Sequence, residues 1–299
     1  MKRFSLDIAF TLMLAVGMIA ALEVAIVRTP NEYSYKDWYM SERADRIKTL
    51  LLGSSLFANS INPYIFGDSV FDGAIVARTV SIDNKILDKY VPGMRNLTTI
   101  IIPVHRGNFE DTIPPMAFQQ PYVTYMGLRF GNGLQYHVDV LLESFHWRKL
   151  KPVHVEPSYK EGQKKLQLVP DSLGYSPILE SWDGHTIKNE VISQGKCNTF
   201  KDAFAQCVTS MAERCDARGV RLIFVQPPVT NTVLNITDRE VFSTLDSIMY
   251  SICRTHTCEY HSYFCDESFR SDSLYGDDSH LNHIGATLFA QRVKEDFNL

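Results

Sequence analysis

Apolar runs and amphipathic stretches alternate along most of this chain. In "RIKTLLLGSS" (46–55) a polar start gives way to a continuous apolar run, and "VRLIFVQPP" (220–228) contains a similar run. Such runs are typical of strands that are covered on both faces in a parallel sheet. A shorter strand is expected in "FDGAIVART" (71–79), and another, rich in β-branched residues, in "LTTIIIPVH" (97–105).

Segments with apolar residues at helical spacing lie between and after these expected strands. They are "SIDNKILDKYV" (81–91), "TFKDAFAQCVTSMAERCDARG" (199–219) and "DREVFSTLDSIMYSICRTH" (238–256). Gly219 follows a basic last turn in the second segment, which is a favourable end for a helix. The alternation of strands and helices predicts an α/β fold with a mostly parallel sheet.

The alternation breaks between about 106 and 196. This segment is rich in aromatic residues and Pro, and it holds one amphipathic stretch at 134–150 and a basic stretch at 148–165. We interpret it as a large insertion in the α/β domain, where residues carried on loops would set substrate specificity. The alternative is that its aromatic side chains pack an additional subdomain.

The N-terminal segment has a pattern of its own. Lys2 and Arg3 precede 8–27, twenty mostly apolar residues in which Glu23 is the only charge. This length is sufficient for a transmembrane helix with its positive end on the cytoplasmic side. A cleaved signal peptide fits less well because the small-residue cleavage pattern is poor, and a buried helix of a soluble protein is the remaining alternative.

The expected organisation is therefore an N-terminal membrane anchor, a connector and one α/β domain with the insertion. Their ranges are 1–28, 29–45 and 46–299, with the insertion at about 106–196. The α/β domain would lie outside the cytoplasm, on the periplasmic or extracellular face of the membrane.

Composition and charge exclude some functions. The chain of 299 residues is 45% hydrophobic and 21% charged, as in ordinary globular proteins. A formal net charge of -4 gives no overall positive field for nucleic acid, so we expect no nucleic-acid partner. The sequence contains no P-loop, dinucleotide fingerprint or G-x-S-x-G motif. We expect no cofactor.

All six cysteines fall between 197 and 265. An even number in an exported chain suggests disulfides, although six cysteines permit fifteen pairings. Cys207 and Cys215 would lie roughly 12 Å apart on one helix, too far to bond to each other. In "CRTHTCEYHSYFC" (253–265) the Cys and His residues could suggest zinc, but C-x-x-C is lacking, so disulfide or core roles are favoured and no metal is expected.

Candidate chemistry comes from two short stretches. Gly53 and Ser55 follow the first apolar run, and Asp277 and His280 stand in a polar loop near the C-terminus. A carboxylate three residues before a histidine can accept the imidazole Nδ1 proton and leave Nε2 to take a proton from a serine. Both stretches would meet at the carboxyl edge of the parallel sheet.

Each of these residues also has an alternative role. Ser55 could cap the helix after the first strand. Asp277 could be a turn residue and His280 a surface loop histidine. Asp278 is a rival to Asp277, but only Asp277 has the three-residue spacing.

These stretches resemble the SGNH (GDSL-type) hydrolase superfamily. Gly-Ser-Ser at 53–55 stands where that family has Gly-Asp-Ser, and Asp277-x-x-His280 matches its final motif. The "HLN…G" continuation and the N-terminal segment are similar to membrane-anchored cell-envelope members, among them polysaccharide O-acetylation proteins and DltD-type proteins of teichoic acid D-alanylation. The resemblance covers roughly 45–110 and 197–299, and it implies a flavodoxin-like three-layer sandwich.

The resemblance also implies a role for each matched residue. Ser55 would be the nucleophile, His280 the general base and then acid, and Asp277 the orienting carboxylate. Ser54 occupies the position of the family's Asp.

The oxyanion hole matches the family less closely. The family uses the nucleophile's N–H, here that of Ser55, a Gly after the second strand and an Asn after the third. This chain offers Gly107 and Asn108 after the third strand, but only Arg78 or Ser81 after the second. The loss of one donor typically costs about 10²–10³ in rate.

The expected function is that of a membrane-anchored, extracytoplasmic serine esterase or O-acyltransferase. Its substrates would be acyl esters, foremost acetyl esters, of an envelope polysaccharide or another O-acylated glycan, and a membrane acyltransferase is a candidate partner. The alternative is a catalytically inactive SGNH-fold subunit that binds carbohydrate or serves assembly.

Overall fold

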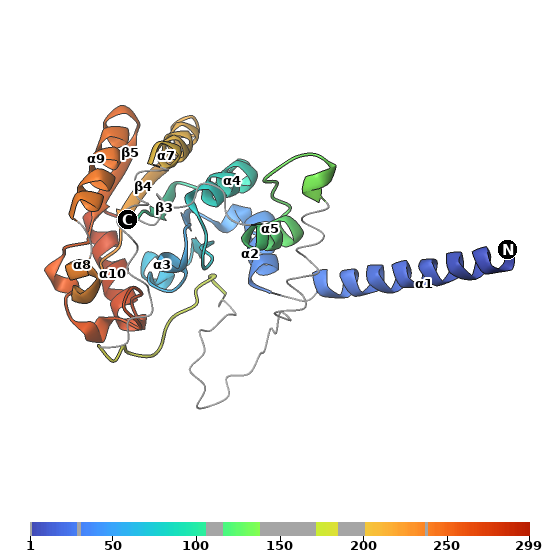
Figure 1. Ribbon diagram of the computed structural model, residues 1–299. Coiled ribbons are helices and arrows are strands. Elements are labelled where there is room, and N and C mark those ends of the chain that lie inside the picture. Colours follow the sequence, from blue (N-terminus) through green and yellow to red (C-terminus); the bar gives the residue numbers. More distant parts are fainter. Residues whose placement is uncertain (1, 29–30, 106–115, 138–171, 185–200, 237–238) are drawn as a thin grey trace.

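A parallel β-sheet forms the centre of the computed structural model, which describes residues 2–28, 31–105, 116–137, 172–184, 201–236 and 239–299. Within these residues the sheet has five strands in the order β2-β1-β3-β4-β5 (Figure 1). The strands are β1 Thr49–Leu51, β2 Val70–Asp72, β3 Thr99–Pro103, β4 Arg221–Gln226 and β5 Cys258–Ser262. The predicted α/β class with a parallel sheet is confirmed.

The order in which the strands are added reverses direction at β1. Residue Leu50 of β1 pairs with Phe71 of β2 on one side and with Ile100 of β3 on the other. The chain thus builds outward from β1 to β2 and then in the opposite direction through β3, β4 and β5. In such sheets ligands bind outside the carboxyl ends of the strands where the direction reverses, here between β1 and β3.

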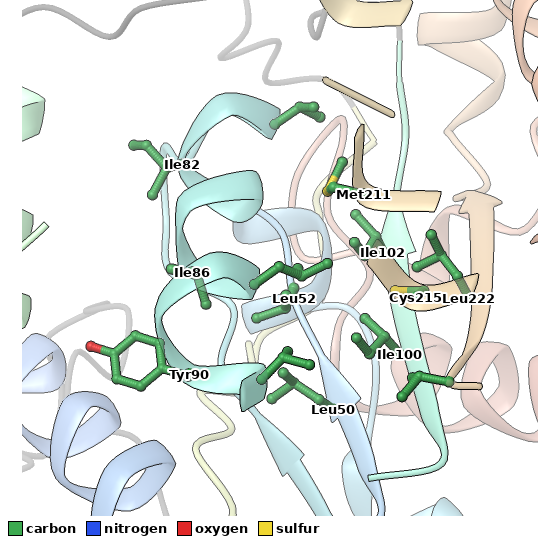
Figure 2. Packing of buried hydrophobic residues seen from close by; sticks show 14 of the residues in the cluster. Leu50, Leu52, Ile82, Ile86, Tyr90, Ile100, Ile102, Met211, Cys215 and Leu222 are labelled. Atoms are coloured by element: carbon green, nitrogen blue, oxygen red, sulfur yellow. The ribbon is translucent and has the colours of Figure 1, made fainter. Parts of the chain in front are cut away.

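Side chains of the strands alternate between two buried layers. Leu50, Leu52, Ile100 and Ile102 lie in one cluster, together with residues of the helices α4 Val80–Tyr90, α7 Lys201–Asp216 and α9 Arg239–Thr255. Figure 2 shows Ile82 and Ile86 of α4 and Met211 and Cys215 of α7 around these strand residues.

The opposite face of the sheet packs against two other helices. Leu51, Ile101 and Ile223 lie there with residues of α3 Ser55–Ala58 and α10 His283–Asp296. Helices therefore cover both faces of the sheet, which is why the central strands β1, β3 and β4 carry continuous apolar runs. This is the expected three-layer arrangement.

The structure describes further helices besides these elements. They are α1 Lys2–Val27, α2 Glu32–Glu42, α5 Met116–Met126, α8 Asn231–Ile236, and the 3-10 helices η1 Ala44–Arg46, η2 Pro63–Phe66, η3 Val91–Gly93, η5 Glu267–Phe269 and η6 Asp272–Leu274. Most of the predicted insertion, with 138–150 of its amphipathic stretch and the whole basic stretch 148–165, lies outside the described residues.

The N-terminal helix α1 extends away from the α/β domain (Figure 1). The transmembrane helix predicted here is not found: in the described part of the chain, no helix combines the length and the apolarity needed to cross a membrane.

The segment expected as a connector, 29–45, forms α2 and η1 in its described part. Met40 is buried in the core, and the ring of Tyr39 stacks on that of Phe71 with centroids 3.9 Å apart. Lys36 is also fully buried. Lysine is almost never buried without a partner, so the position of Lys36 is expected on the exposed face of a helix. For this reason the buried face of α2 cannot be recognised from the sequence pattern.

Two strands differ from the prediction. β2 begins at Val70 and ends at Asp72, so most of the predicted 71–79 strand is a loop. β5 was not predicted, because it is an edge strand whose residues are mostly half-buried and polar. The helices predicted at 81–91, 199–219 and 238–256 correspond to α4, α7 and α9.

The expected disulfides are absent among the described cysteines, which are Cys207, Cys215, Cys253, Cys258 and Cys265. Cys197 lies outside the described residues. Cys215 and Cys258 are buried among apolar side chains, where a thiol packs as a small hydrophobic group. The even number of cysteines therefore does not indicate disulfides here, because some of these thiols belong to the core.

Candidate active site

The loop after β1 places Ser55 at the carboxyl edge of the sheet. Gly53 has φ +117°, and a Cβ built there would lie 2.3 Å from Cγ of Pro103, at the end of β3. Only glycine fits both the backbone conformation and the close approach. The Ser54 side chain accepts a hydrogen bond from the Leu56 N–H at 3.5 Å as the N-cap of α3. The capping role considered for Ser55 thus falls to Ser54.

The loop before α10 holds Asp277 and His280 by short-range hydrogen bonds. Asp277 Oδ1 accepts from the backbone N–H groups of Ser279 at 2.9 Å and His280 at 2.8 Å. The two Asp277 carboxylate oxygens lie 2.9 and 3.1 Å from His280 Nδ1. Burial opposes ionisation of Asp277, but the hydrogen bonds from His280 and Ser279 outweigh it and lower its pKa to about 2.

The structure brings the two loops together. His280 Nε2 lies 2.8 Å from Ser55 Oγ, although the two residues are 225 positions apart in sequence. Because the Asp277 carboxylate can only accept, we assign the His280 ring proton to Nδ1, so that Nε2 accepts from the Ser55 hydroxyl. The side chains of His280 and Asp277 are 20% and 14% exposed, so the pair is screened from solvent but still accessible.

Neighbouring contacts fix the position of the His280 loop. Ser60, which follows α3, accepts a hydrogen bond from the Leu281 N–H at 3.0 Å. Asn282 Oδ1 caps α10 by accepting from the N–H groups of Ile284 and Gly285 at 3.0 and 3.1 Å. The hydrogen bond from Leu281 to Ser60 ties the loop to the element that carries Ser55.

The first turn of α10 requires a glycine, and the loop before α10 buries the second aspartate. A Cβ at Gly285 would lie 2.2 Å from the Leu274 carbonyl oxygen, so the "HLN…G" stretch is explained by a cap and a close contact. Asp278, the rival to Asp277, is fully buried, and its carbonyl oxygen accepts from the Thr230 hydroxyl at 2.8 Å. Asp277 is the aspartate that contacts the His280 ring.

Residues 172–184, which we name the bridging segment, contact both loops. Near α3, the Ser176 N–H donates to the Ala58 carbonyl at 3.0 Å, and Asn59 Nδ2 donates to the Ser176 carbonyl at 2.6 Å. Near α10, the Trp182 N–H donates to the Tyr275 carbonyl at 2.7 Å. Sequence reasoning missed these contacts, because they are made mainly by backbone groups.

The structure describes Arg78 and Ser55, two of the residues expected to form the oxyanion hole. Arg78 is buried, with Nε 2.8 Å from Asp83 Oδ1 and Nη1 donating to the Gly73 carbonyl at 2.8 Å. Two of its nitrogens are thus directed at protein groups. Gly107 and Asn108 lie outside the described residues. Ser55 stands at the first position of α3, next to the Ser54 cap.

Comparison with known proteins gives a fold but no family. No family model matches the chain, and no curated protein matches it. Among solved structures, a protein from Streptococcus pneumonia, provisionally assigned as a platelet activating factor, aligns over 96% of this chain and 99% of its own, with a TM-score of 0.50 and 9% identity. A provisionally assigned acylhydrolase from Bacteroides fragilis NCTC 9343 has a TM-score of 0.42 and 11% identity, covering 84% of this chain and 86% of its own. At such low identity the first likeness shows a shared α/β fold.

Proposed function

We propose that this chain is an SGNH-type serine esterase or O-acyltransferase. The observation that carries the proposal is the continuous contact from Asp277 through His280 to Ser55 Oγ, at the carboxyl edge of a parallel sheet. A carboxylate, an imidazole and a hydroxyl in this order form the apparatus of acyl transfer to serine.

The reaction begins when Ser55 Oγ attacks the carbonyl carbon of an acyl ester. His280 Nε2 takes the Ser55 proton, and the ionised Asp277 stabilises the imidazolium that forms. His280 then gives this proton to the leaving alkoxide, which leaves an acyl-serine. Water or a sugar hydroxyl attacks the acyl-serine while His280 takes its proton. The acyl group passes to that acceptor, and His280 returns the proton to the departing Ser55 Oγ.

The developing oxyanion would need hydrogen-bond donors. We propose the backbone N–H of Ser55 as one donor, and Gly107 and Asn108 as further donors. The low pKa of Asp277, about 2, supports the scheme because it keeps this carboxylate charged at neutral pH, where it can stabilise an imidazolium.

Labelling with a serine-directed phosphonate tests this proposal. We expect the wild-type chain to be labelled and to hydrolyse p-nitrophenyl acetate, and Ser55→Ala to do neither. Ser54→Ala is the matched control, because it removes the neighbouring hydroxyl and should retain labelling. Failure to label the wild type would contradict the enzyme and favour an inactive carbohydrate-binding or assembly subunit.

As the substrate we propose acetyl esters of an envelope glycan. The support is the resemblance of the Gly-Ser-Ser and Asp-x-x-His stretches to cell-envelope members of that superfamily. Turnover of an acetyl ester with and without candidate glycans separates the two reactions: acetylated glycan appears only with a transferase, whereas a hydrolase releases acetate in both cases. A membrane acyltransferase is the proposed acyl-supplying partner in the first case.

We also propose that α1 attaches the protein to a membrane, with the α/β domain on the periplasmic or extracellular face. The side chains of Phe10, Met13 and Val16 on α1 are 57%, 64% and 64% exposed, which makes them available to lipid. Fractionation of cells that produce the full chain or a variant without residues 1–28 tests this. We expect the full chain in the membrane fraction and the variant in the soluble fraction, and a soluble full chain would contradict attachment.

A further inference from the structure

We propose that Asp83 of α4 is a positioning residue that holds the Gly53 amide and thereby sets Ser55 against His280. This inference rests on the proposed function. Asp83 is only 2% exposed and lies 30 positions after Gly53 in sequence. Its carboxylate does not belong to the Ser55, His280 and Asp277 contacts described above.

Both backbone groups of Gly53, the N–H and the carbonyl, are hydrogen-bonded. Asp83 Oδ1 accepts a hydrogen bond from the Gly53 N–H at 3.1 Å. The Gly53 carbonyl oxygen accepts another from the Ile75 N–H at 3.0 Å. These two bonds fix the peptide groups on either side of a residue whose backbone is in the left-handed region, two positions before Ser55.

Arg78 pairs with Asp83 and connects it to the loop after β2. Its Nε lies 2.8 Å from Asp83 Oδ1, and its Nη1 donates to the Gly73 carbonyl at 2.8 Å. Gly73 in turn donates its N–H to the Leu51 carbonyl at 2.9 Å. Burial raises the pKa of Asp83 to about 6, while Arg78 and the Gly53 N–H act in the opposite direction. The carboxylate, the guanidinium and the two loops are thus connected by hydrogen bonds and an ion pair, and Gly53 in this group lies two positions before Ser55.

A fixed Gly53 amide matters because the reaction depends on the distance between Ser55 and His280. A misplacement of about 1 Å in an active site can cost about 10² in rate. Asp83 would act on Ser55 through Gly53 rather than on the substrate. Its loss should therefore lower kcat and leave KM unchanged.

Two double variants separate positioning from stability. Arg78→Met with Asp83→Asn and Arg78→Met with Asp83→Leu both remove the buried charges, so neither leaves an unpaired ion. The Asn side chain can still accept from the Gly53 N–H, whereas the Leu side chain cannot. We expect kcat for p-nitrophenyl acetate to be at least about 10-fold higher in the Asn variant, at equal KM.

Asp88→Asn is the matched control for these variants. Asp88 lies on the same helix, its side chain is 75% exposed, and its ion pair with Arg214 is long at 3.9 Å. We expect kcat of this variant within about twofold of the wild type, as for other surface changes. Equal kcat in the two double variants, at equal melting temperature, would overturn the positioning role.

Hydrogen exchange of the Gly53 amide tests the hold without any reliance on activity. We expect exchange in the peptide that contains Gly53 to be at least about 10-fold faster in the Leu double variant than in the Asn double variant. Equal exchange rates would show that Asp83 does not hold this amide, even if the enzyme is active. An inactive, unlabelled wild type with the expected exchange difference would instead contradict the proposed function alone.

Discussion

The two loops that meet at the candidate active site are held in different ways. In the loop before α10, the Asp277 and His280 pair is held by local contacts, because Asp277 accepts hydrogen bonds from groups no more than three residues away. The loop after β1 is stabilised from a distance. Gly53 is packed against Pro103 and hydrogen-bonded to Asp83, 50 and 30 positions further along the chain.

The geometry within a catalytic pair and the position of a catalytic residue in the fold thus depend on different contacts. The Asp277 and His280 pair is a local unit whose geometry depends little on the rest of the fold. The position of Ser55 depends on how β3 and α4 pack around β1. Substitutions far from the site should therefore act on the serine more readily than on the histidine.

The largest expected effect comes from breaking the contact between the two loops. His280→Ala should lower kcat/KM by about 10⁴–10⁶, because Ser55 loses its base. The double variant Ser55→Ala/His280→Ala should lose no more than the larger single loss, since the residues act as a unit. Ester hydrolysis measures both.

His283→Ala is the control for that substitution, because His283 is an exposed residue at the start of α10. It should keep wild-type kcat/KM within about twofold. Additive losses in the double variant would show that the two loops work independently.

The second effect concerns the distant support of the Ser55 loop. Gly53→Ala and Gly67→Ala both place a side chain at positive φ, with strain of about 1–3 kcal/mol. Only Gly53 also meets Pro103, whereas no atom lies within 4 Å of a Cβ at Gly67. We expect the free energy of unfolding to fall by about 1–3 kcal/mol more for Gly53→Ala, as measured by urea denaturation. Equal losses would mean that Pro103 yields.

The third effect is a difference in the pH dependence of stability between the loops. The pKa of Asp277 is lowered to about 2, so its contribution of about 2 kcal/mol is present above pH 4 and is lost as the pH falls through about 2. The pKa of Asp83 is raised to about 6, so its burial costs stability above that pH and the cost disappears as the pH falls below about 4.

Unfolding free energies of Asp277→Asn and Asp83→Asn between pH 2 and pH 7 measure this contrast. The deficit of Asp277→Asn relative to the wild type should grow with pH and level off above about pH 4. The wild type should gain stability relative to Asp83→Asn as the pH falls from 7 to 4. The contrast would be refuted if the stability difference from the wild type changed with pH in the same direction for both variants.

The smallest effect concerns the cap that follows His280. Asn282→Ala removes the acceptor for the Ile284 and Gly285 N–H groups and should cost about 1 kcal/mol. Asn282→Ser keeps a capping oxygen and should cost less. Thermal unfolding of the two variants ranks them, and a larger loss for Ser would contradict the capping role.

The same contrast explains which parts of the molecule could be predicted. The apolar runs predicted three central strands, because burial on both faces leaves a direct signal in the sequence. Asp277 and His280 could be paired because their contact is short-range. Ser55 was predicted from its place at a strand end, but its support by Asp83 was not, since an aspartate on an amphipathic helix is usually solvated.

Other features left misleading signals or none. In α2, Lys36 is buried because its ammonium group pairs with Glu32 at 2.9 Å and donates to the Ala74 carbonyl. β5 is an edge strand with polar side chains, so its pattern resembled a loop. The cysteine count suggested disulfides because a count does not distinguish a cysteine in a disulfide from a free thiol buried in the core.

The bridging segment has a practical consequence for anyone who wishes to shorten this protein. By sequence it belongs to the insertion between 106 and 196. It nevertheless makes hydrogen bonds both to the end of α3, which carries Ser55, and to Tyr275, which precedes the His280 loop. A deletion of the whole insertion would remove these hydrogen bonds, and the serine and histidine loops would lose a connection to each other. A trimmed chain should therefore keep residues 172–184.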